Sequence, residues 1–510
     1  MVDTERFRLR RFVEKLTQMG ECEMREQPTD LIDVAACLDG NPKAVRFAAV
    51  GKERAELVGN VMGSRRRLAI ALDTDEKELM PTLAERLRHP HKPIKVTQKD
   101  APVQEVVLEG EEADLCALPV HLQHGEDGAP YISAGLDFSI MRGSGHANVG
   151  CRRIMLRGPR TAGIDLIAPS DLRANYLEAV ARGEKLPVAF AVGSHPADFM
   201  AAVSATAPMD ELEVIGAVRG APVPVVKCIT NDVHVPADAE YVLEGYLDAR
   251  GHAEPEGPYG EYVGYYGVVK TNPVFHLTAI TRRKDALFQT VTIGGRHLAH
   301  TDTAQVTTVK TETAAWAALV TAVREPVAVY ATPSSGGMYN LRVSLRQRVP
   351  GEARNAIAAV FGSMAEAKHV FVFDDDIDVF SDAQVDWALA TRHQGDRDLI
   401  VAGGFRVVPL DPSLGGARTG AKVGFDCTIP FGKRQALEWS VPAPPVLPRR
   451  ERRASVAEAL AAGPASFLDL MAALGTRDGR EVVRELDHLY AANRLGRDER
   501  GRYVLKDKVN

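Results

Sequence analysis

Short apolar segments separated by polar turns predict that strands dominate the middle of the chain. Runs rich in valine, alanine and phenylalanine stand at 132–141, 188–193, 222–228 and 273–280. A further run at 286–294 follows the segment Arg-Arg-Lys-Asp, which predicts a hairpin between the last two runs. Many strands with few helices between them are typical of a barrel or a strongly bent sheet.

The N-terminal part follows a different pattern. Apolar residues at helical spacing predict an amphipathic helix over 5–19. Short apolar runs at 44–51, 67–73 and 104–110 then accompany a helical stretch around 76–88. This mixture predicts an α/β domain at the start of the chain.

The pattern changes again beyond the strand-rich middle. From about 303 to 430, helical and apolar strand-like segments alternate, which predicts a βαβ-type layer. Prolines and arginines at 440–453 have the composition of a linker. The remaining segment has three helical stretches followed by two short strands, an order similar to a small winged-helix module.

Composition limits the classes of protein to consider. A chain of 510 residues exceeds what one hydrophobic core usually serves, so two or three domains are expected. The net charge of -6 is small, so neither nucleic acid nor a membrane surface is expected as a partner. Six scattered cysteines and the lack of a signal-like or spanning apolar segment predict a soluble, cytoplasmic protein.

An acidic, glycine-rich segment at 254–267 is the densest chemical signal. It sets Glu256 and Glu261 on either side of a Gly-Pro-Tyr-Gly bend, which excludes a regular helix. Two carboxylates held close together separate in pKa, so that one can carry a proton near neutral pH. The alternative is a glycine-rich turn with two solvated glutamates.

A second signal is the segment 146–158, where Asn148 and Arg153 interrupt a predicted strand. Arg153 could bind a substrate carboxylate through two hydrogen bonds, and Asn148 could offer an oxygen to a hard cation. A surface arginine on an edge strand is the simpler alternative.

These segments together resemble the UbiD family of decarboxylases. The resemblance spans about 1–440, and its stretches follow the family's order. Two of them are short motifs, Asn-Val-Gly-Cys-Arg-Arg at 148–153 and Glu-Gly-Pro-Tyr-Gly-Glu at 256–261, and the longer ones lie at 225–247, 371–392 and 420–428. The resemblance implies an N-terminal α/β domain at 1–115, a flavin-reductase-like split β-barrel at 116–302, an α/β oligomerisation domain at 303–440, and a linker with a winged-helix-like module at 441–510.

The resemblance also implies a reversible, non-oxidative decarboxylase of an aromatic, heteroaromatic or α,β-unsaturated carboxylic acid. Its cofactor would be prenylated FMN (prFMN) from a partner prenyltransferase, with Mn²⁺ or a similar divalent metal and K⁺ nearby. Arg153 matches the carboxylate clamp, Glu256 its partner and Glu261 the proton donor. Further matches imply metal ligation by Asn148 and Glu211, and cofactor binding by Asn148, Cys151, Arg152, Arg153, Ala168, Glu211 and Lys422. A homodimer or higher homo-oligomer is expected.

One departure from the family pattern concerns the metal. Pro169 stands where the family usually supplies a histidine ligand, so the site is altered, shifted to Asp165 or Asp171, or completed by water. Two other functions therefore stay open. The first is a binding or regulatory protein that kept the fold and uses its C-terminal module to contact a partner or nucleic acid. The second is a flavin reductase with unmodified FMN.

Overall fold

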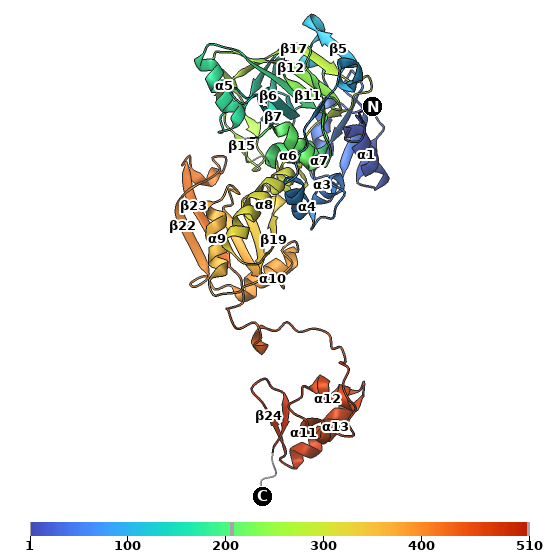
Figure 1. The fold of residues 1–510 in the computed structure, drawn as a ribbon, viewed down its shortest axis with the longest axis vertical. Coiled ribbons are helices and arrows are strands. Elements are labelled where there is room, and N and C mark those ends of the chain that lie inside the picture. The colour runs from blue at the N-terminus through green and yellow to red at the C-terminus, as the bar shows by residue number, and fades with distance from the viewer. Residues whose placement is uncertain (1, 205–208, 507–510) are drawn as a thin grey trace. The chain divides into compact units, whose positions relative to one another are not determined.

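The computed structural model describes residues 2–204 and 209–506 (Figure 1). Its internal contacts divide the chain into two compact units, Met1–Thr428 and Ile429–Asn510. Each unit encloses a hydrophobic core of its own. Helices and strands are mixed throughout, which confirms the predicted α/β class.

The first unit begins with a four-stranded sheet and its helices. In sheet order the strands are β1 (Cys22–Arg25), β2 (Ala44–Val50), β3 (Ala55–Gly59) and β18 (Phe288–Gln289). The helices are α1 (Leu9–Gln18), α2 (Leu31–Leu38), α3 (Arg65–Ala71) and α4 (Leu79–Arg86). Helix α1 buries Leu9, Phe12 and Leu16 on one face, in agreement with the apolar spacing. The apolar run at 67–73 forms much of α3 and is therefore not a strand.

Six antiparallel strands close into a barrel in the middle of the chain (Figure 1). Around the barrel they are β12 (Tyr241–Leu247), β9 (Leu186–Val192), β6 (Tyr131–Ile140), β7 (Ala147–Gly158), β8 (Thr161–Ile164) and β17 (Val274–Arg282). Strand β12 pairs with both β9 and β17, which closes the ring. Strand β5 (Val106–Glu109) pairs with the other part of β17. The barrel that the sequence predicts is thus confirmed.

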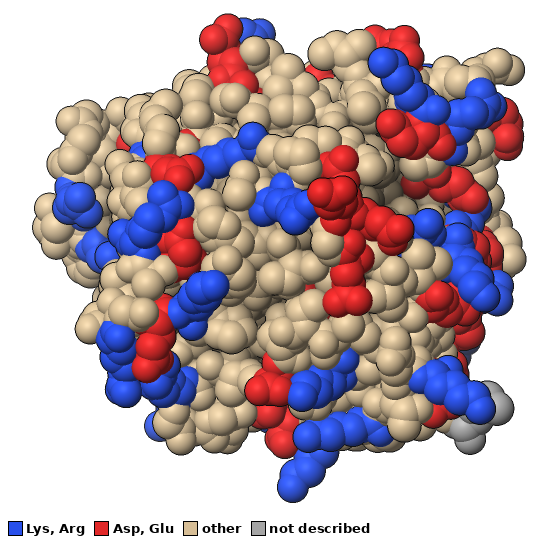
Figure 2. Space-filling model, turned by 90° about the horizontal axis from the view of Figure 1, so that it is seen from above, with Lys and Arg blue, Asp and Glu red and all other residues tan. Residues whose placement is uncertain are grey.

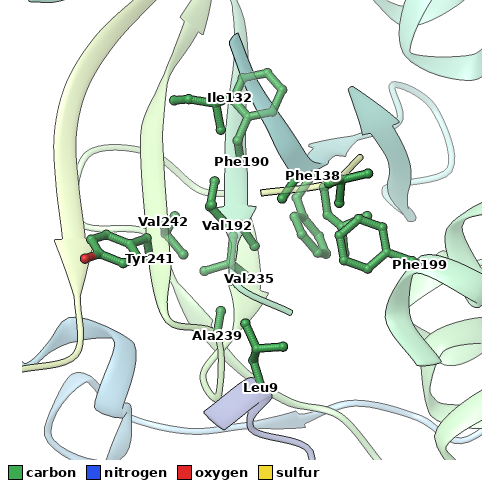
Figure 3. Close-up of a cluster of buried hydrophobic side chains, with 14 of the residues drawn as sticks. Leu9, Ile132, Phe138, Phe190, Val192, Phe199, Val235, Ala239, Tyr241 and Val242 are labelled. Atoms are coloured by element: carbon green, nitrogen blue, oxygen red, sulfur yellow. The ribbon is translucent and has the colours of Figure 1, made fainter. Parts of the chain in front are cut away.

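A small sheet and three helices surround the barrel. The sheet contains β11 (His234–Pro236), β10 (Pro224–Lys227) and β4 (Ile94–Lys95), and the helices are α5 (Asp171–Ala181), α6 (Pro196–Ser204) and α7 (Glu211–Arg219). Figure 3 shows Phe138 and Phe190 of the barrel in one apolar cluster with Val235 of β11 and Leu9 of α1. The barrel and the N-terminal region therefore share a single core.

The predicted hairpin between the runs at 273–280 and 286–294 is wrong. Strand β18 leaves the barrel and pairs in parallel with β3 of the N-terminal sheet, whereas β17 stays in the barrel. Arg283, between them, donates hydrogen bonds to the Thr4 carbonyl at 2.9 Å and to Glu5 at 2.7 Å. The segment Arg-Arg-Lys-Asp, predicted to form a hairpin turn, therefore connects two different sheets. Its Arg283 is bonded to the N-terminal segment.

The last part of the first unit is a five-stranded mixed sheet with helices. The strands, in sheet order, are β19 (Pro326–Ala331), β20 (Asn340–Leu345), β21 (His369–Asp374), β23 (Thr419–Asp426) and β22 (Leu399–Arg406). The helices are α8 (Asp302–Ala322), α9 (Glu352–Gly362) and α10 (Asp382–Arg392). The three middle strands run parallel, as the predicted βαβ pattern requires. Helix α8 packs against α6 beside the barrel and against α9 and β19 of this sheet (Figure 1).

The second unit contains three helices and a two-stranded antiparallel sheet, in the predicted order. They are α11 (Val456–Ala461), α12 (Phe467–Leu474), α13 (Gly479–Ala491), β24 (Leu495–Arg497) and β25 (Tyr503–Leu505). Val456, Leu470, Val482 and Leu486 form the centre of its core.

Across the face of the molecule in Figure 2, acidic and basic side chains lie interspersed, in keeping with the small net charge. Among residues 2–204 and 209–506, no helix combines the length and the apolar character needed to span a bilayer.

Candidate active site

Two short strand pairings hold the acidic segment 254–267 against its neighbours. They join β13 (Glu254–Glu256) to β16 (Lys270–Asn272), and β14 (Tyr259–Gly260) to β15 (Tyr266–Gly267). Gly257 lies between them with φ +100°, a conformation that residues with a side chain rarely adopt. A Cβ atom at Gly267 would lie 2.7 Å from Oε1 of Glu261. The backbone of this segment thus requires glycine where it turns and where it passes the carboxylate.

Arg153, on barrel strand β7, bonds to both glutamates of this segment. Its Nε and Nη2 atoms donate to the two carboxylate oxygens of Glu256 at 2.9 and 3.1 Å. Its Nη1 atom donates to Oε1 of Glu261 at 2.7 Å. The Arg153 side chain is 11% exposed, while Glu256 is fully buried and Glu261 is 4% exposed. The structure therefore brings the three predicted catalytic residues into one buried cluster.

Asp165, Lys270 and Asn272 complete the cluster. Oδ2 of Asp165 lies 2.9 Å from Nη2 of Arg153 and 3.6 Å from Nζ of Lys270. The Asn272 amide donates to Glu256 at 3.2 Å and to Asp165 at 3.4 Å. A third carboxylate and a second cation thus adjoin the predicted trio.

Lys270 and Asn272 are not among the site residues that the sequence predicts, and Asp165 is predicted there only as an alternative metal ligand. The available signal was the position of Lys270 and Asn272 two residues apart, on a strand that follows the acidic segment directly. Their pairing with β13 is a tertiary contact that neither motif nor periodicity indicates.

Two tyrosines lie against the cluster. The Arg153 guanidinium lies 4.6 Å from the centre of the Tyr259 ring, close enough for a cation–π interaction. The Tyr131 ring packs on Tyr259 with the ring centres 4.3 Å apart. The Tyr131 hydroxyl is buried and has no hydrogen-bond partner among the described residues. It lies near Glu256, since burial and then the charge of that carboxylate raise the Tyr131 pKa.

The acids of the cluster differ in proton affinity. Burial raises the pKa of Glu261 above its ordinary value, and the charge of Arg153 offsets this only in part. Burial alone would also raise the pKa of Asp165, but Arg153 and Lys270 outweigh it and lower that pKa. Glu261 therefore holds a proton more tightly than an ordinary glutamate, and Asp165 holds one less tightly than an ordinary aspartate, a difference that suits the cluster to acid–base chemistry.

The predicted metal ligands Asn148 and Glu211 lie close together. Glu211 accepts a hydrogen bond from the backbone N–H of Val149, and the Asn148 amide donates to Asp137 at 3.3 Å. Burial raises the pKa of Glu211 to about 7. The described residues contain no group of three or more His, Cys, Asp or Glu side chains placed to hold a metal ion.

The two alternatives for the missing histidine ligand lie in different places. Pro169 itself is exposed. Asp165 pairs with Arg153 in the acidic cluster. The pKa of Glu211 is raised mainly by its burial, and the negative charge of Asp171 raises it further. Of the two, it is Asp171 whose charge acts on a predicted metal ligand.

The remaining predicted cofactor residues are dispersed. Cys151 is half-buried next to Arg152, whose guanidinium donates to the Ser170 hydroxyl at 3.1 Å. Ala168 is exposed. The buried ammonium group of Lys422, on β23, donates to the Phe361 carbonyl at 2.8 Å. The described contacts do not join Lys422 to the Arg153 cluster.

Comparison with known families matches most of the first unit. The N-terminal, Rift-related and C-terminal domain models of 3-octaprenyl-4-hydroxybenzoate carboxy-lyase (UbiD) match residues 18–87, 94–297 and 306–427. Residues 428–510 lie outside all three matches.

Individual relatives agree with these matches. The chain is 32% identical over 438 residues to the anhydromevalonate phosphate decarboxylase of Methanosarcina mazei, an alignment that covers 85% of this chain and 98% of that protein. It is also similar to the UbiD-class enzyme HmfF of Pelotomaculum thermopropionicum in complex with FMN, with 32% identity, a TM-score of 0.80, and coverage of 86% and 97% of the two chains. An evolved dimeric form of HmfF in complex with prFMN is 31% identical, with a TM-score of 0.77 and the same coverage. The chain therefore belongs to the UbiD family of carboxy-lyases.

Proposed function

We propose that this chain catalyses the reversible, non-oxidative decarboxylation of an aromatic, heteroaromatic or α,β-unsaturated carboxylic acid. The observation that carries the proposal is the Arg153 guanidinium bonded to both Glu256 and Glu261 at 2.7–3.1 Å. A guanidinium binds carboxylates through two parallel hydrogen bonds, and a nearby carboxylic acid can replace the lost CO₂ with a proton.

Each residue of the trio has a separate task. Arg153 orients the substrate carboxylate, so that the bond between this group and the substrate carbon can break. The electron pair stays on that carbon, and Glu261 delivers a proton to it once CO₂ has left. Glu256, fully buried and held by Asn272, fixes the orientation of Arg153. Solvent returns a proton to Glu261 after product release.

Prenylated FMN, supplied by a flavin prenyltransferase, is the proposed cofactor. When bound, it would provide the electron sink that a carbanion without an adjacent carbonyl requires. The buried Tyr131 hydroxyl beside Glu256, which lacks a partner in the described chain, fits a group bound at this place. Cys151, Arg152, Ala168 and Lys422 would hold the cofactor in the remaining part of the site.

The proposed metal site has two predicted protein ligands. Asn148 and Glu211 would supply two oxygen ligands to Mn²⁺ or a similar divalent cation, with K⁺ nearby. Pro169 has no ligand to offer, so Asp171 or water would complete this site. We assign no step of the reaction to the metal. A homo-oligomer is proposed as well, supported by the dimeric form among the relatives.

Glu261→Gln tests the proposed proton donor. The enzyme would be produced together with a flavin prenyltransferase, and a panel of aromatic, heteroaromatic and cinnamic-type acids would be screened for CO₂ release. The variant keeps the size of the side chain but cannot donate a carboxylic proton, so kcat should fall at least about 100-fold. Solvent-deuterium incorporation into the product should fall equally.

Glu254→Gln is the matched control, because Glu254 lies in the same acidic segment as Glu261 but pairs with Arg157 and Arg250 outside the cluster. It should retain activity. The mass and absorption spectrum of the bound flavin should be the same in all variants. Full activity of Glu261→Gln would rule out the assignment, and bound FMN without the prenyl group would favour a flavin reductase.

A further inference from the structure

The outer fork of Arg153, formed by Nη1 and Nη2, already has two carboxylate neighbours. Nη1 donates to Oε1 of Glu261 at 2.7 Å, and Nη2 lies 2.9 Å from Oδ2 of Asp165. The opposite edge, formed by Nε and Nη2, is bonded to Glu256. A substrate carboxylate that uses the outer fork must therefore displace two oxygen atoms of the protein.

The two displaced groups leave in different ways. Glu261 is the proton donor, and as a neutral acid it has little attraction to the guanidinium. Asp165 is ionised, so it needs another cation if it is to leave Arg153 without remaining as an unpaired charge. Nζ of Lys270 lies 3.6 Å from the same Oδ2 atom.

The geometry of Asp165 suits such a transfer. Its other oxygen, Oδ1, accepts hydrogen bonds from the backbone N–H of Ile167 at 3.2 Å and from Asn272 at 3.4 Å. Within the described part of the chain, the polar neighbours of Oδ2 are the cationic groups of Arg153 and Lys270. Rotation about the anchored side chain therefore moves one oxygen between two cations while the other oxygen keeps its partners.

Exposure identifies the side from which a substrate reaches the fork. The side chains of Asp165 and Lys270 are 21% and 22% exposed, whereas Glu256 is fully buried and Glu261 is 4% exposed. Asp165 and Lys270 thus form the open edge of the cluster, and Glu256 forms its closed edge.

We propose that Asp165 occupies the place of the substrate carboxylate on Arg153, and that Lys270 takes over Asp165 when the substrate binds. This inference rests on the proposed function, since the incoming carboxylate is what displaces Asp165. Both residues are positioning residues that act through Arg153. The exchange replaces one carboxylate on Arg153 by another, so the positive charge of its guanidinium is paired with a negative charge before and after the substrate binds.

Two single variants of the flavin-loaded enzyme test the exchange. Asp165→Asn keeps the shape and the Oδ1 contacts but removes the competing charge, so KM should fall about fivefold with kcat changed less than about twofold. Lys270→Met leaves Asp165 with Arg153 as its cation, so KM should rise about fivefold. Lys270→Arg should restore the KM of the wild type.

The double variant Asp165→Asn/Lys270→Met separates exchange from direct substrate binding by Lys270. If Lys270 acts through Asp165, the double variant has the KM of Asp165→Asn alone. If Lys270 contacts the substrate itself, Lys270→Met raises KM in both backgrounds, which overturns the proposal. Should Asp165→Asn fail to fold, the Lys270→Met and Lys270→Arg pair decides, because equal KM values for the two would also overturn it.

A binding measurement keeps this test independent of turnover. Calorimetric titration of the flavin-loaded protein with benzoate, used as a simple carboxylate probe, should give a dissociation constant about fivefold lower for Asp165→Asn. If the wild-type enzyme releases CO₂ from none of the acids in the panel, the proposed function fails, and benzoate binding still tests the exchange. If Glu261→Gln is inactive while Asp165→Asn changes neither KM nor benzoate affinity, the exchange alone is wrong.

Discussion

Two arginines of the first unit have similar partners but different access to solvent. Arg219, at the end of α7, bonds Asp198 at 2.7 Å and Asp238 at 2.6 Å, and none of the three side chains is more than 2% exposed. The ring of Phe7 covers its guanidinium at 4.9 Å. Arg153 likewise lies among carboxylates, three in its case, and against a tyrosine ring, but its cluster has an open edge.

The difference between the clusters lies in exposure and in additional charge, not in residue type. The Arg219 cluster joins segments that are packed around the barrel, and all of its carboxylates are buried. The Arg153 cluster adds Asp165 and Lys270 on the exposed side. A closed cluster can only stabilise the fold, whereas an open one can exchange a protein carboxylate for a substrate carboxylate. This distinction favours Arg153 over Arg219 as the arginine of the proposed reaction.

The largest expected effect on stability comes from the closed cluster. Arg219→Met should lower the free energy of unfolding by about 3–5 kcal/mol, because it leaves Asp198 and Asp238 buried without their cation. Urea denaturation followed by circular dichroism measures this loss.

Arg153→Met is the matched variant in the open cluster. It should cost less stability, since Lys270 remains 4.0 Å from Glu261 and Asn272 still holds Glu256. Decarboxylation should be lost. If both variants lost equal stability and equal activity, exposure would not distinguish the two clusters, and the comparison would be wrong.

Much of the fold could be predicted from the sequence because its signals are local. The apolar runs on β6, β9 and β17 are continuous, and the helix α1 has a clear apolar face. The order of elements in the second unit also follows directly from its apolar pattern and its turns. The hairpin after β17 was wrong because strand pairing depends on tertiary contacts, here those of Arg283 with the N-terminal segment.

The candidate site could be predicted only in part. Glu256 and Glu261 share one segment, and their resemblance to a family motif linked them to Arg153, about 100 residues away. Asp165 and Lys270 carry no motif, and their role depends on distances that only the folded chain defines. Residue type also could not distinguish Arg153 from Arg219, since burial decides between them.

A smaller effect should appear in the pH dependence of stability. Glu261 has a raised pKa in the folded protein, so its contribution to stability is full below the ordinary value of 4.5 and is lost as pH rises through the raised value. The free energy of unfolding of the wild type should therefore fall relative to that of Glu261→Gln over this interval. Each tenfold difference in proton affinity between the folded and unfolded states corresponds to about 1.4 kcal/mol of this fall.

Asp165→Asn provides a control of opposite sign. The pKa of Asp165 is lowered, so its contribution is present above the ordinary value of 3.8 and is lost as pH falls through the lowered value. The free energy of unfolding of the three proteins, measured between about pH 3 and about pH 8, would separate the two acids. This interval includes the ordinary carboxyl pKa of about 4. Identical slopes for wild type and Glu261→Gln would contradict a raised Glu261 pKa.

The smallest effect is expected for an arginine on the surface of the second unit. Arg450 pairs with Asp469 at 2.6 Å, but its side chain is 55% exposed. Asp469 also accepts hydrogen bonds from Ser466 within its own helix cap, so it keeps partners when the arginine is removed. Arg450→Met should therefore change the free energy of unfolding by less than about 0.5 kcal/mol. Since the described residues of the Arg153 cluster all belong to the first unit, kcat and KM should stay at wild-type values. A loss of activity in this variant would show that solvent exposure does not predict the size of the effect of these arginine variants. It would also indicate that the second unit contributes to catalysis.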